Sequence, residues 1–293
     1  MASITETGDP VWRAFFAELR LLGDIEGKNL VVEQYSAEGH PERYAELAQQ
    51  AVKSHPDLIY ASGNGIALAV EALSRTIPIV GLLWDPLRNG LVRSLARPGG
   101  NLTGVSIDPG AAIYQKRLQL LKEAAPSASR VAVLVMRESW KGPTVPDFRA
   151  AGQRLGIALI AEPVAEGTSS AIIRTFAAIL RDRPDAVFVS GDYEFFVHRR
   201  LLLDFLEKNR LPASFQWREF VAEGGLMSYG VDLRDLSRRL AGIAHRVLLG
   251  AKPADIPISQ PTRFVLSINL RTAKALGLTI PQSLLALADE IIQ

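Results

Sequence analysis

The segment DLIYASGNGIALAVEALSRTIPIVGLL, residues 57–83, predicts a strand, a helix and a second strand in succession. Residues 57–63 and 77–83 are short runs of aliphatic side chains bounded by Gly, Asn or Pro, which is typical of buried strands. Residues 65–75, between them, have a helical pattern. Two strands joined by a helix are usually parallel, and a parallel sheet is covered by helices on both faces. The segment therefore predicts an α/β fold.

The same alternation extends in both directions along the chain. In the first part of the chain, further strands are expected at 30–35 and 102–107, and helices at 10–22, 41–54 and 86–96. After it, helices are expected at 111–124, 147–155, 169–181 and 194–208, and strands at 130–135, 158–164, 185–191 and 212–215. The segment RPGGNLTG (97–104) between the two groups has the composition of a linker. The chain is therefore predicted to form two α/β units.

The last part of the chain is too small for a third domain. Strands are expected at 226–230 and 264–269, and helices at 232–250, 271–277 and 282–292. Two strands bury little alone, so this part is expected to complete both units through three crossings, near 102–108, 225–231 and 259–265. The predicted domains are 1–104 with 229–262, and 105–228 with 263–293.

Composition excludes several classes of function. The 293 residues carry 33 basic and 31 acidic side chains, and a net charge of +2 gives no support for binding nucleic acid. The absence of cysteine excludes disulfides, thiolate nucleophiles and zinc sites built on Cys. No apolar run approaches 18 residues, so no transmembrane helix is expected. The first residues, MASITETGDPVW, show no signal peptide.

The stretch WREFVAEGGLMSYG (217–230) places two adjacent glycines just before the second expected crossing. Gly224 and Gly225 suit a hinge, because a hinge must absorb large changes of φ and ψ. They equally suit a turn that ends a helix, and the two interpretations are compatible. Gly104 and Gly230, near the first and second crossings, are further candidate hinge residues.

In parallel α/β sheets, ligands bind outside the carboxyl ends of the strands. The candidate ligand-binding residues at these ends are Ser62, Gly63, Asn64, Trp84, Asp85, Arg137, Asp192, Tyr193, Trp217 and Tyr229, and Glu138 and Gln216 lie beside them. Serine, amide and backbone N–H groups suit a carboxylate, acids suit an ammonium group, and Trp and Tyr offer flat apolar walls. For each residue the alternative is a loop or cap role; Asp85 before Pro86 suits a helix N-cap.

A dinucleotide site is the alternative interpretation of the same strand ends. SGNGIAL (62–68) contains G-x-G between a strand and a helix, and Asp85 follows about 20 residues later. This pattern would serve a nucleotide-dependent oxidoreductase that uses the loop from Gly63 to Gly65. The third glycine of the fingerprint is replaced by Leu68, however. The four histidines are scattered, so no catalytic residue, metal or cofactor is expected.

Several segments resemble one protein family. WREFVAEGGLMSYG and PTRFVLSINLRTAKALGLTIPQSLLALADEII (261–292) are similar to the substrate-binding proteins of bacterial ABC transport systems, a group in which some members bind aromatic amino acids. Residues 29–39, 85–106 and 116–135 resemble the same family. The resemblance implies a type I periplasmic-binding-protein fold, with two Rossmann-like lobes joined by three crossings and a ligand held in the cleft by hinge closure.

The resemblance also implies the biological setting. The expected protein is not an enzyme, has no cofactor and acts as a periplasmic monomer. Its expected partners are a small solute, such as an amino acid or similar carboxylate, and the permease and ATPase of an importer, with no nucleic acid.

Two departures from the family pattern stand out. Relatives begin with an export signal and a first strand, whereas this chain starts at MAS, about where that strand would end. The first strand of the N-lobe is therefore expected to be missing, with Met1 a misassigned start or a truncation. The segments LLWD (82–85) and MRESW (136–140) also differ from relatives, and Trp84 is expected to narrow the ligand pocket.

Overall fold

A computed structural model describes residues 1–5, 10–38, 40–108, 110–142 and 144–293. The chain divides into two compact units: unit 1 comprises 1–108 and 232–263, and unit 2 comprises 109–231 and 264–293. Each unit is built from two separate segments of the chain, so the chain passes between the units three times, as predicted. Each unit is an α/β structure with its own sheet.

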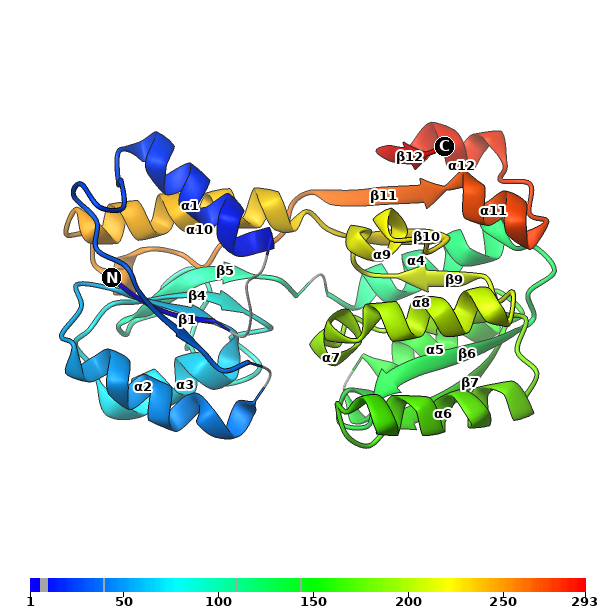
Figure 1. Ribbon diagram of the computed structural model, residues 1–293, viewed down its shortest axis with the longest axis horizontal. Coiled ribbons are helices and arrows are strands. Elements are labelled where there is room, and N and C mark those ends of the chain that lie inside the picture. Colours follow the sequence, from blue (N-terminus) through cyan, green and yellow to red (C-terminus); the bar gives the residue numbers. More distant parts are fainter. Residues whose placement is uncertain (6–9, 39, 109, 143) are drawn as a thin grey trace. The chain divides into compact units, whose positions relative to one another are not determined.

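Unit 1 contains a five-stranded parallel sheet in the order β2-β1-β3-β4-β5. Its strands are β1 (Ala2–Thr5), β2 (Glu33–Ser36), β3 (Ile59–Ser62), β4 (Ile79–Leu83) and β5 (Leu102–Ser106). Figure 1 shows helices α1 (Pro10–Leu22) and α10 (Leu233–Leu248) together on one face, and α2 (Tyr44–Lys53) and α3 (Asn64–Leu73) on the other. A short 3-10 turn, η1 (Pro41–Arg43), precedes α2, and η3 (Pro253–Asp255) follows α10.

The prediction that unit 1 lacks its first strand is wrong. Strand β1 occupies the middle of the sheet and pairs with both β2 and β3. Ala2 is fully buried and Ser3 is 1% exposed. The sequence ASIT offers only one aliphatic β-branched side chain in four residues, so it carries almost no strand signal. Its burial comes from the two neighbouring strands, which sequence periodicity does not reveal.

The segment 86–96, predicted as a helix, forms turns and bends instead. Its first turn begins as a helix would, because the Asp85 carboxylate accepts a hydrogen bond from the backbone N–H of Arg88 at 3.1 Å. Gly90 then adopts a positive φ of 71°, and the backbone N–H groups of Leu91 and Val92 both donate to the carbonyl of Pro86. The Asp85 carboxylate therefore closes a turn, and the helix that Asp85 and Pro86 were expected to begin is absent.

Unit 2 contains a seven-stranded sheet in the order β12-β11-β10-β9-β8-β6-β7. Its strands are β6 (Arg130–Met136), β7 (Ala158–Val164), β8 (Ala186–Val189), β9 (Ala213–Phe215), β10 (Met227–Val231), β11 (Phe264–Asn269) and β12 (Glu290–Ile292). The pairs are parallel except β10 with β11, which is antiparallel. The sheet was expected to be parallel, but β11 and β12, at one edge, run in the direction opposite to the other strands.

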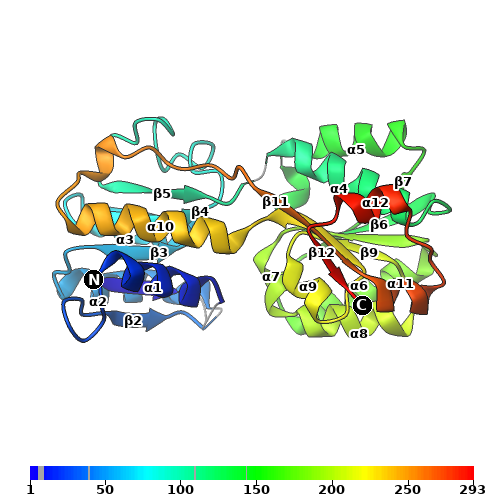
Figure 2. The same cartoon turned by 90° about the horizontal axis from the view of Figure 1, so that it is seen from above.

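Helices cover both faces of the second sheet (Figure 2). One face carries α4 (Ala111–Ala124), α5 (Val145–Arg154) and α12 (Gln282–Leu287), and the other carries α6 (Ser169–Arg181), α8 (Arg199–Lys208) and α9 (Arg218–Ala222). Two predicted helices are altered. The first, 194–208, is divided into α7 (Tyr193–Val197) and α8, and the second, 282–292, ends at Leu287 before β12. The remaining elements are α11 (Leu270–Leu276) and the 3-10 turn η2 (Ser139–Lys141).

The adjacent glycines of WREFVAEGGLMSYG end helix α9. Gly224 has a φ of 116°, and its N–H donates to the carbonyl of Val221 at 3.2 Å. The N–H of Gly225 donates to the carbonyl of Phe220 at 2.7 Å. These two bonds form a Schellman motif, which satisfies the last carbonyls of a helix and needs a left-handed residue. A Cβ on Gly225 would also lie 2.6 Å from the Phe215 ring. Of the two interpretations, the helix-ending turn is present.

Candidate functional site

At the carboxyl end of the unit 1 sheet, Asn64 connects two predicted site segments. Its side-chain Oδ1 accepts the backbone N–H of Trp84 at 2.9 Å, and its Nδ2 donates to the Trp84 carbonyl at 2.6 Å. The preceding Gly63 has a φ of 111°, which lets the chain turn from β3 into α3. Asn64 therefore holds the loops after β3 and β4 together, and brings Ser62 and Gly63 beside Trp84.

Asp85 is bound by its own loop. Besides accepting the N–H of Arg88, its carboxylate lies 3.3 Å from the guanidinium of that residue. Asn89 adds hydrogen bonds from its side chain to the carbonyls of Trp84 and Asp85. Asp85 thus shapes the loop, and the half-buried ring of Trp84 remains as the large apolar group at this edge.

In unit 2, Asp192 connects the ends of β6 and β8. Its carboxylate accepts the backbone N–H of Met136 at 2.8 Å and the hydroxyls of Ser139 and Ser190, each at 2.5 Å. Hydrogen bonds to an ionised carboxylate are stronger than neutral ones. Asp192 therefore fixes the loop 136–140 against the start of α7, at Tyr193. The side chain of Tyr193 lies outside the described part of the chain.

Arg137, which follows Met136 in the same loop, is exposed. Its backbone N–H donates to the carbonyl of Val164 at 2.8 Å. Its guanidinium makes no hydrogen bond or ion pair within the described residues. It can therefore meet an anion without first losing a protein partner.

The two aromatic candidates of unit 2 differ in exposure. Trp217 is 7% exposed and precedes α9 as its N-cap residue. Tyr229 is half-buried in β10, with its ring stacked on Phe264 at a centroid distance of 5.9 Å. Burial raises the pKa of the Tyr229 phenol, and the charge of Asp289 raises it further. Tyr229 stays neutral at physiological pH and offers a flat face, whereas Trp217 belongs largely to the core.

Gly104 and Gly230 are needed for close backbone packing. A Cβ on Gly104, whose φ is 149°, would lie 2.0 Å from the carbonyl oxygen of Gly81 in the next strand. A Cβ on Gly230 would lie 1.9 Å from the carbonyl oxygen of Gln216. Both glycines lie inside strands, β5 and β10. Their role as hinges, and that of Gly224 and Gly225, stays a prediction.

Two further side chains of unit 2 are buried: Gln216, which was named beside the predicted ligand-binding residues, and Arg117, which was not predicted. Gln216, directly after β9, is 2% exposed, and Arg117 on α4 is fully buried. The Nη2 of Arg117 donates to the carbonyls of Val189 and Ser214, and its guanidinium lies 4.2 Å from the centroid of the Phe188 ring. Gln216 has a sequence signal, its place at a strand end. Arg117 has none, because its helical spacing does not reveal burial.

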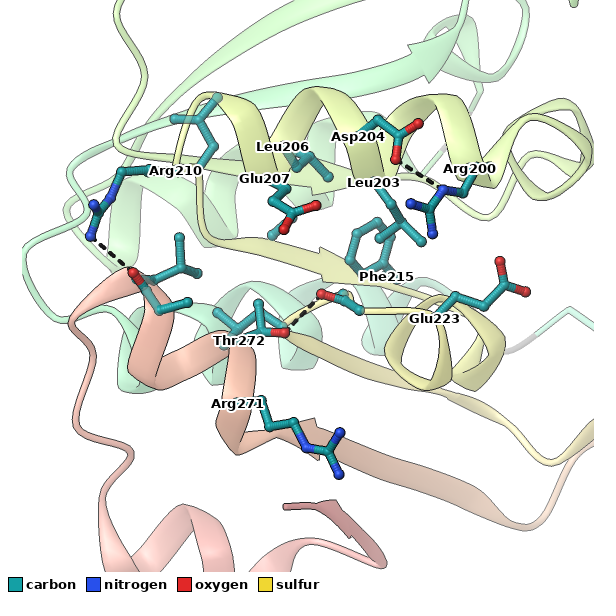
Figure 3. A pocket seen from close by; sticks show the side chains of 17 residues that line it. Arg200, Leu203, Asp204, Leu206, Glu207, Arg210, Phe215, Glu223, Arg271 and Thr272 are labelled. Atoms are coloured by element: carbon teal, nitrogen blue, oxygen red, sulfur yellow. Dashed lines mark hydrogen bonds and ion pairs between the residues drawn. The ribbon is translucent and has the colours of Figure 1, made fainter.

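A cavity of about 370 Å³ lies in unit 2 between α8 and α11 (Figure 3). Phe215 lines it, and at its rim Arg200 pairs with Asp204 at 2.9 Å. Gly224 and Gly225 contribute to its wall. Of the described residues that line it, none is a predicted ligand-binding residue, so this cavity is separate from the strand-end groups.

Clusters that could hold a metal ion and membrane-spanning helices are both absent from the described residues. Within the described ranges, no group of three or more His, Asp or Glu side chains could hold a metal ion. No helix among the described residues is long and apolar enough to cross a membrane.

The chain is similar to known proteins over nearly its whole length. Residues 15–292 match the family described as ABC transporter substrate binding protein. A protein named tyrosine-binding protein, from Clostridioides difficile (strain R20291), is 25% identical over 272 residues, which cover 92% of this chain and 77% of the relative.

Solved structures agree with the described fold. One of them is the ABC domain from Streptococcus pneumoniae in complex with L-Trp. It has a TM-score of 0.86 and 25% sequence identity, and the match covers 99% of this chain and 99% of that one. A conserved domain protein from Vibrio cholerae has a TM-score of 0.88 at 24% identity, over 99% of this chain and 98% of that one. The second likeness concerns the fold alone.

Proposed function

Because this chain belongs to the family of ABC transporter substrate-binding proteins, we propose that it binds an amino acid or a similar small carboxylate for import by an ABC transporter. The chain has the type I periplasmic-binding-protein fold and is a binding protein, not an enzyme. The alternative of a nucleotide-dependent oxidoreductase is therefore rejected.

The choice of ligand is supported by what two similar proteins bind. Both cover at least 92% of this chain, and their descriptions name tyrosine and L-Trp as what they bind. The strand ends supply suitable chemistry: Trp84 and Tyr229 offer apolar faces for a side chain, and the exposed Arg137 is a cation that favours an anionic ligand. Aromatic amino acids are therefore the first candidates.

The proposed mechanism uses both units. One unit holds the ligand first, and movement at the three crossings brings the candidate residues of the other unit onto it. The ligand shifts this equilibrium only through the additional contacts of the closed state. In this proposal a monomer acts in the periplasm, delivers its ligand to the permease and its ATPase, and needs no nucleic acid or cofactor.

A thermal-shift screen tests the ligand class. The purified chain is measured with the common amino acids, with other small carboxylates and with nicotinamide dinucleotides. A ligand that binds only the folded state raises the melting temperature, and at 100 times Kd the stabilisation is about 2.7 kcal/mol. A shift with an amino acid or carboxylate is expected. A shift with a dinucleotide alone would contradict the proposal.

Removing the aromatic faces should weaken binding. Trp84→Ala and Tyr229→Ala are each expected to raise Kd for the amino acid that gives the largest thermal shift, with a loss of about tenfold for at least one of them, because aromatic packing contributes roughly 0.5–1.5 kcal/mol beyond burial. Trp84→Phe, which keeps a flat ring, is the matched control and should lose less. Calorimetry measures Kd. Unchanged affinity in both alanine variants would exclude the aromatic faces from the site.

A further inference from the structure

Gln216 is a buried amide without a partner. Its side chain is 2% exposed, and neither Oε1 nor Nε2 has a hydrogen bond among the described residues. Buried side-chain amides in folded proteins are normally hydrogen-bonded, because they have lost their contacts with water. An amide with both polar atoms unpaired therefore requires an explanation, and a bound ligand is one.

Two glycines pack closely against Gln216, where any larger residue would collide with it. A Cβ on Gly191 would lie 2.0 Å from the side-chain Oε1 of Gln216, and a Cβ on Gly230 would lie 1.9 Å from its backbone oxygen. Gly191 directly precedes Asp192 beyond β8, and Gln216 directly follows β9. The amide thus lies at the carboxyl ends of two neighbouring parallel strands, which is where ligands bind in this class of sheet.

A buried positive charge lies behind this amide. The guanidinium of Arg117 donates to the carbonyls of Val189 and Ser214, which are two residues before Gly191 and Gln216 on their strands. Two residues of a strand span about 7 Å. Among the described residues, Nε and Nη1 of Arg117 have no hydrogen-bond partner, and this side chain makes no ion pair.

The charge of Arg117 persists at neutral pH. Burial lowers the pKa of Arg117 to about 9, which still leaves the guanidinium protonated at pH 7. A buried cation that makes no ion pair with the described acidic side chains favours a negative group in its surroundings, because the interior screens charge weakly. The end of β9 is therefore better suited to a carboxylate than to an isolated ammonium group.

We infer that Gln216 is a ligand-recognition residue whose Nε2 donates a hydrogen bond to the carboxylate of a bound amino acid, with the charge of Arg117 favouring that carboxylate. Oε1 is then available to accept from the ammonium group of the same ligand. The inference rests on the proposed function. It specifies which side chain of unit 2 binds the carboxylate and ammonium groups of the ligand.

The test compares matched variants with matched probes. Calorimetry measures Kd of L-tyrosine, L-tryptophan and their decarboxylated forms, tyramine and tryptamine, for the wild type, Gln216→Leu, Gln216→Glu and Ser214→Ala. Ser214 is the control, because its hydroxyl is also buried and unpartnered but lies inside β9. Thermal unfolding of each variant separates loss of binding from loss of folding.

Gln216→Leu is expected to raise Kd for the amino acid at least tenfold without lowering the melting temperature, since it removes an unpaired buried amide. Gln216→Glu should lose at least as much, because it places a negative charge against the carboxylate. Ser214→Ala should bind within twofold of the wild type. Gln216→Leu should weaken the amines less than the amino acids, because the amines lose only the Oε1 acceptor, and Gln216→Glu, which keeps an acceptor, should not weaken them.

Either failure is recognisable. Wild-type affinity in Gln216→Leu and Gln216→Glu, with binding by the wild type intact, would overturn this inference and leave the proposed function standing. Absence of binding of both amino acids by the wild type would overturn the aromatic amino acid proposal, and this inference with it.

Discussion

Gly104→Ala is expected to lower the free energy of unfolding of unit 1 by about 3 kcal/mol or more, because two costs coincide. The new Cβ would lie 2.0 Å from the carbonyl oxygen of Gly81 and 2.7 Å from its nitrogen, and real Cβ atoms do not approach so closely. The φ of 149° is also unfavourable for alanine. Because the obstacle is backbone of the paired strand β4, the sheet itself must shift.

Gly242→Ala is the matched control for this substitution. Gly242 lies in helix α10 of the same unit, and a Cβ there would meet nothing within 4 Å. Alanine is favoured over glycine inside a helix by about 0.5–1 kcal/mol, so this variant should be neutral or more stable. Urea unfolding of both variants measures the difference. Equal stability of the two variants would contradict the packing described for β4 and β5.

The second large effect is expected at Asp192. Asp192→Ala should destabilise unit 2 by about 3 kcal/mol, because three donors lose a charged acceptor and each such bond contributes about 1.5–3 kcal/mol with incomplete additivity. The donors are the backbone N–H of Met136 and the hydroxyls of Ser139 and Ser190. The loop 136–140 should then detach from the start of α7, and Arg137 should lose its position.

Two further variants make this result specific. Asp192→Asn keeps one acceptor oxygen and should lose roughly half as much stability as the alanine variant, about 1.5 kcal/mol. Glu138→Ala removes a neighbouring acid whose ion pair with Lys141 is exposed, so it should change stability by less than about 0.5 kcal/mol. Denaturant unfolding measures all three. A loss at Asp192 no greater than at Glu138 would show that the three hydrogen bonds do not hold the loop.

Long amphipathic helices were predictable because their pattern is local. The segments 10–22, 111–124 and 169–181 were predicted with the bounds that α1, α4 and α6 have. In α1, Phe15 and Leu19 are four residues apart, lie on one helix face and are fully buried. Strand β1 was missed for the opposite reason, since only its pairing with two distant strands makes it a strand.

Sequence predicted that Asn64 and Asp192 follow strands, and their role in ligand binding stays a prediction. It could not show that Asn64 is bound to Trp84, twenty residues away, or that Asp192 is bound across β6 and β8. Gln216 shows the reverse case. Its place at the strand end depends on two glycines far away in the sequence: a Cβ on Gly191 would lie 2.0 Å from its Oε1, and a Cβ on Gly230 would lie 1.9 Å from its backbone oxygen.

The proposed function requires that this chain binds one amino acid molecule at the ends of its strands. Isothermal titration of the wild-type protein with L-tyrosine and with L-tryptophan tests it most directly. Saturable binding of at least one of them is expected, with one site per chain. Absence of a binding signal for both, in a protein that unfolds cooperatively, would contradict it.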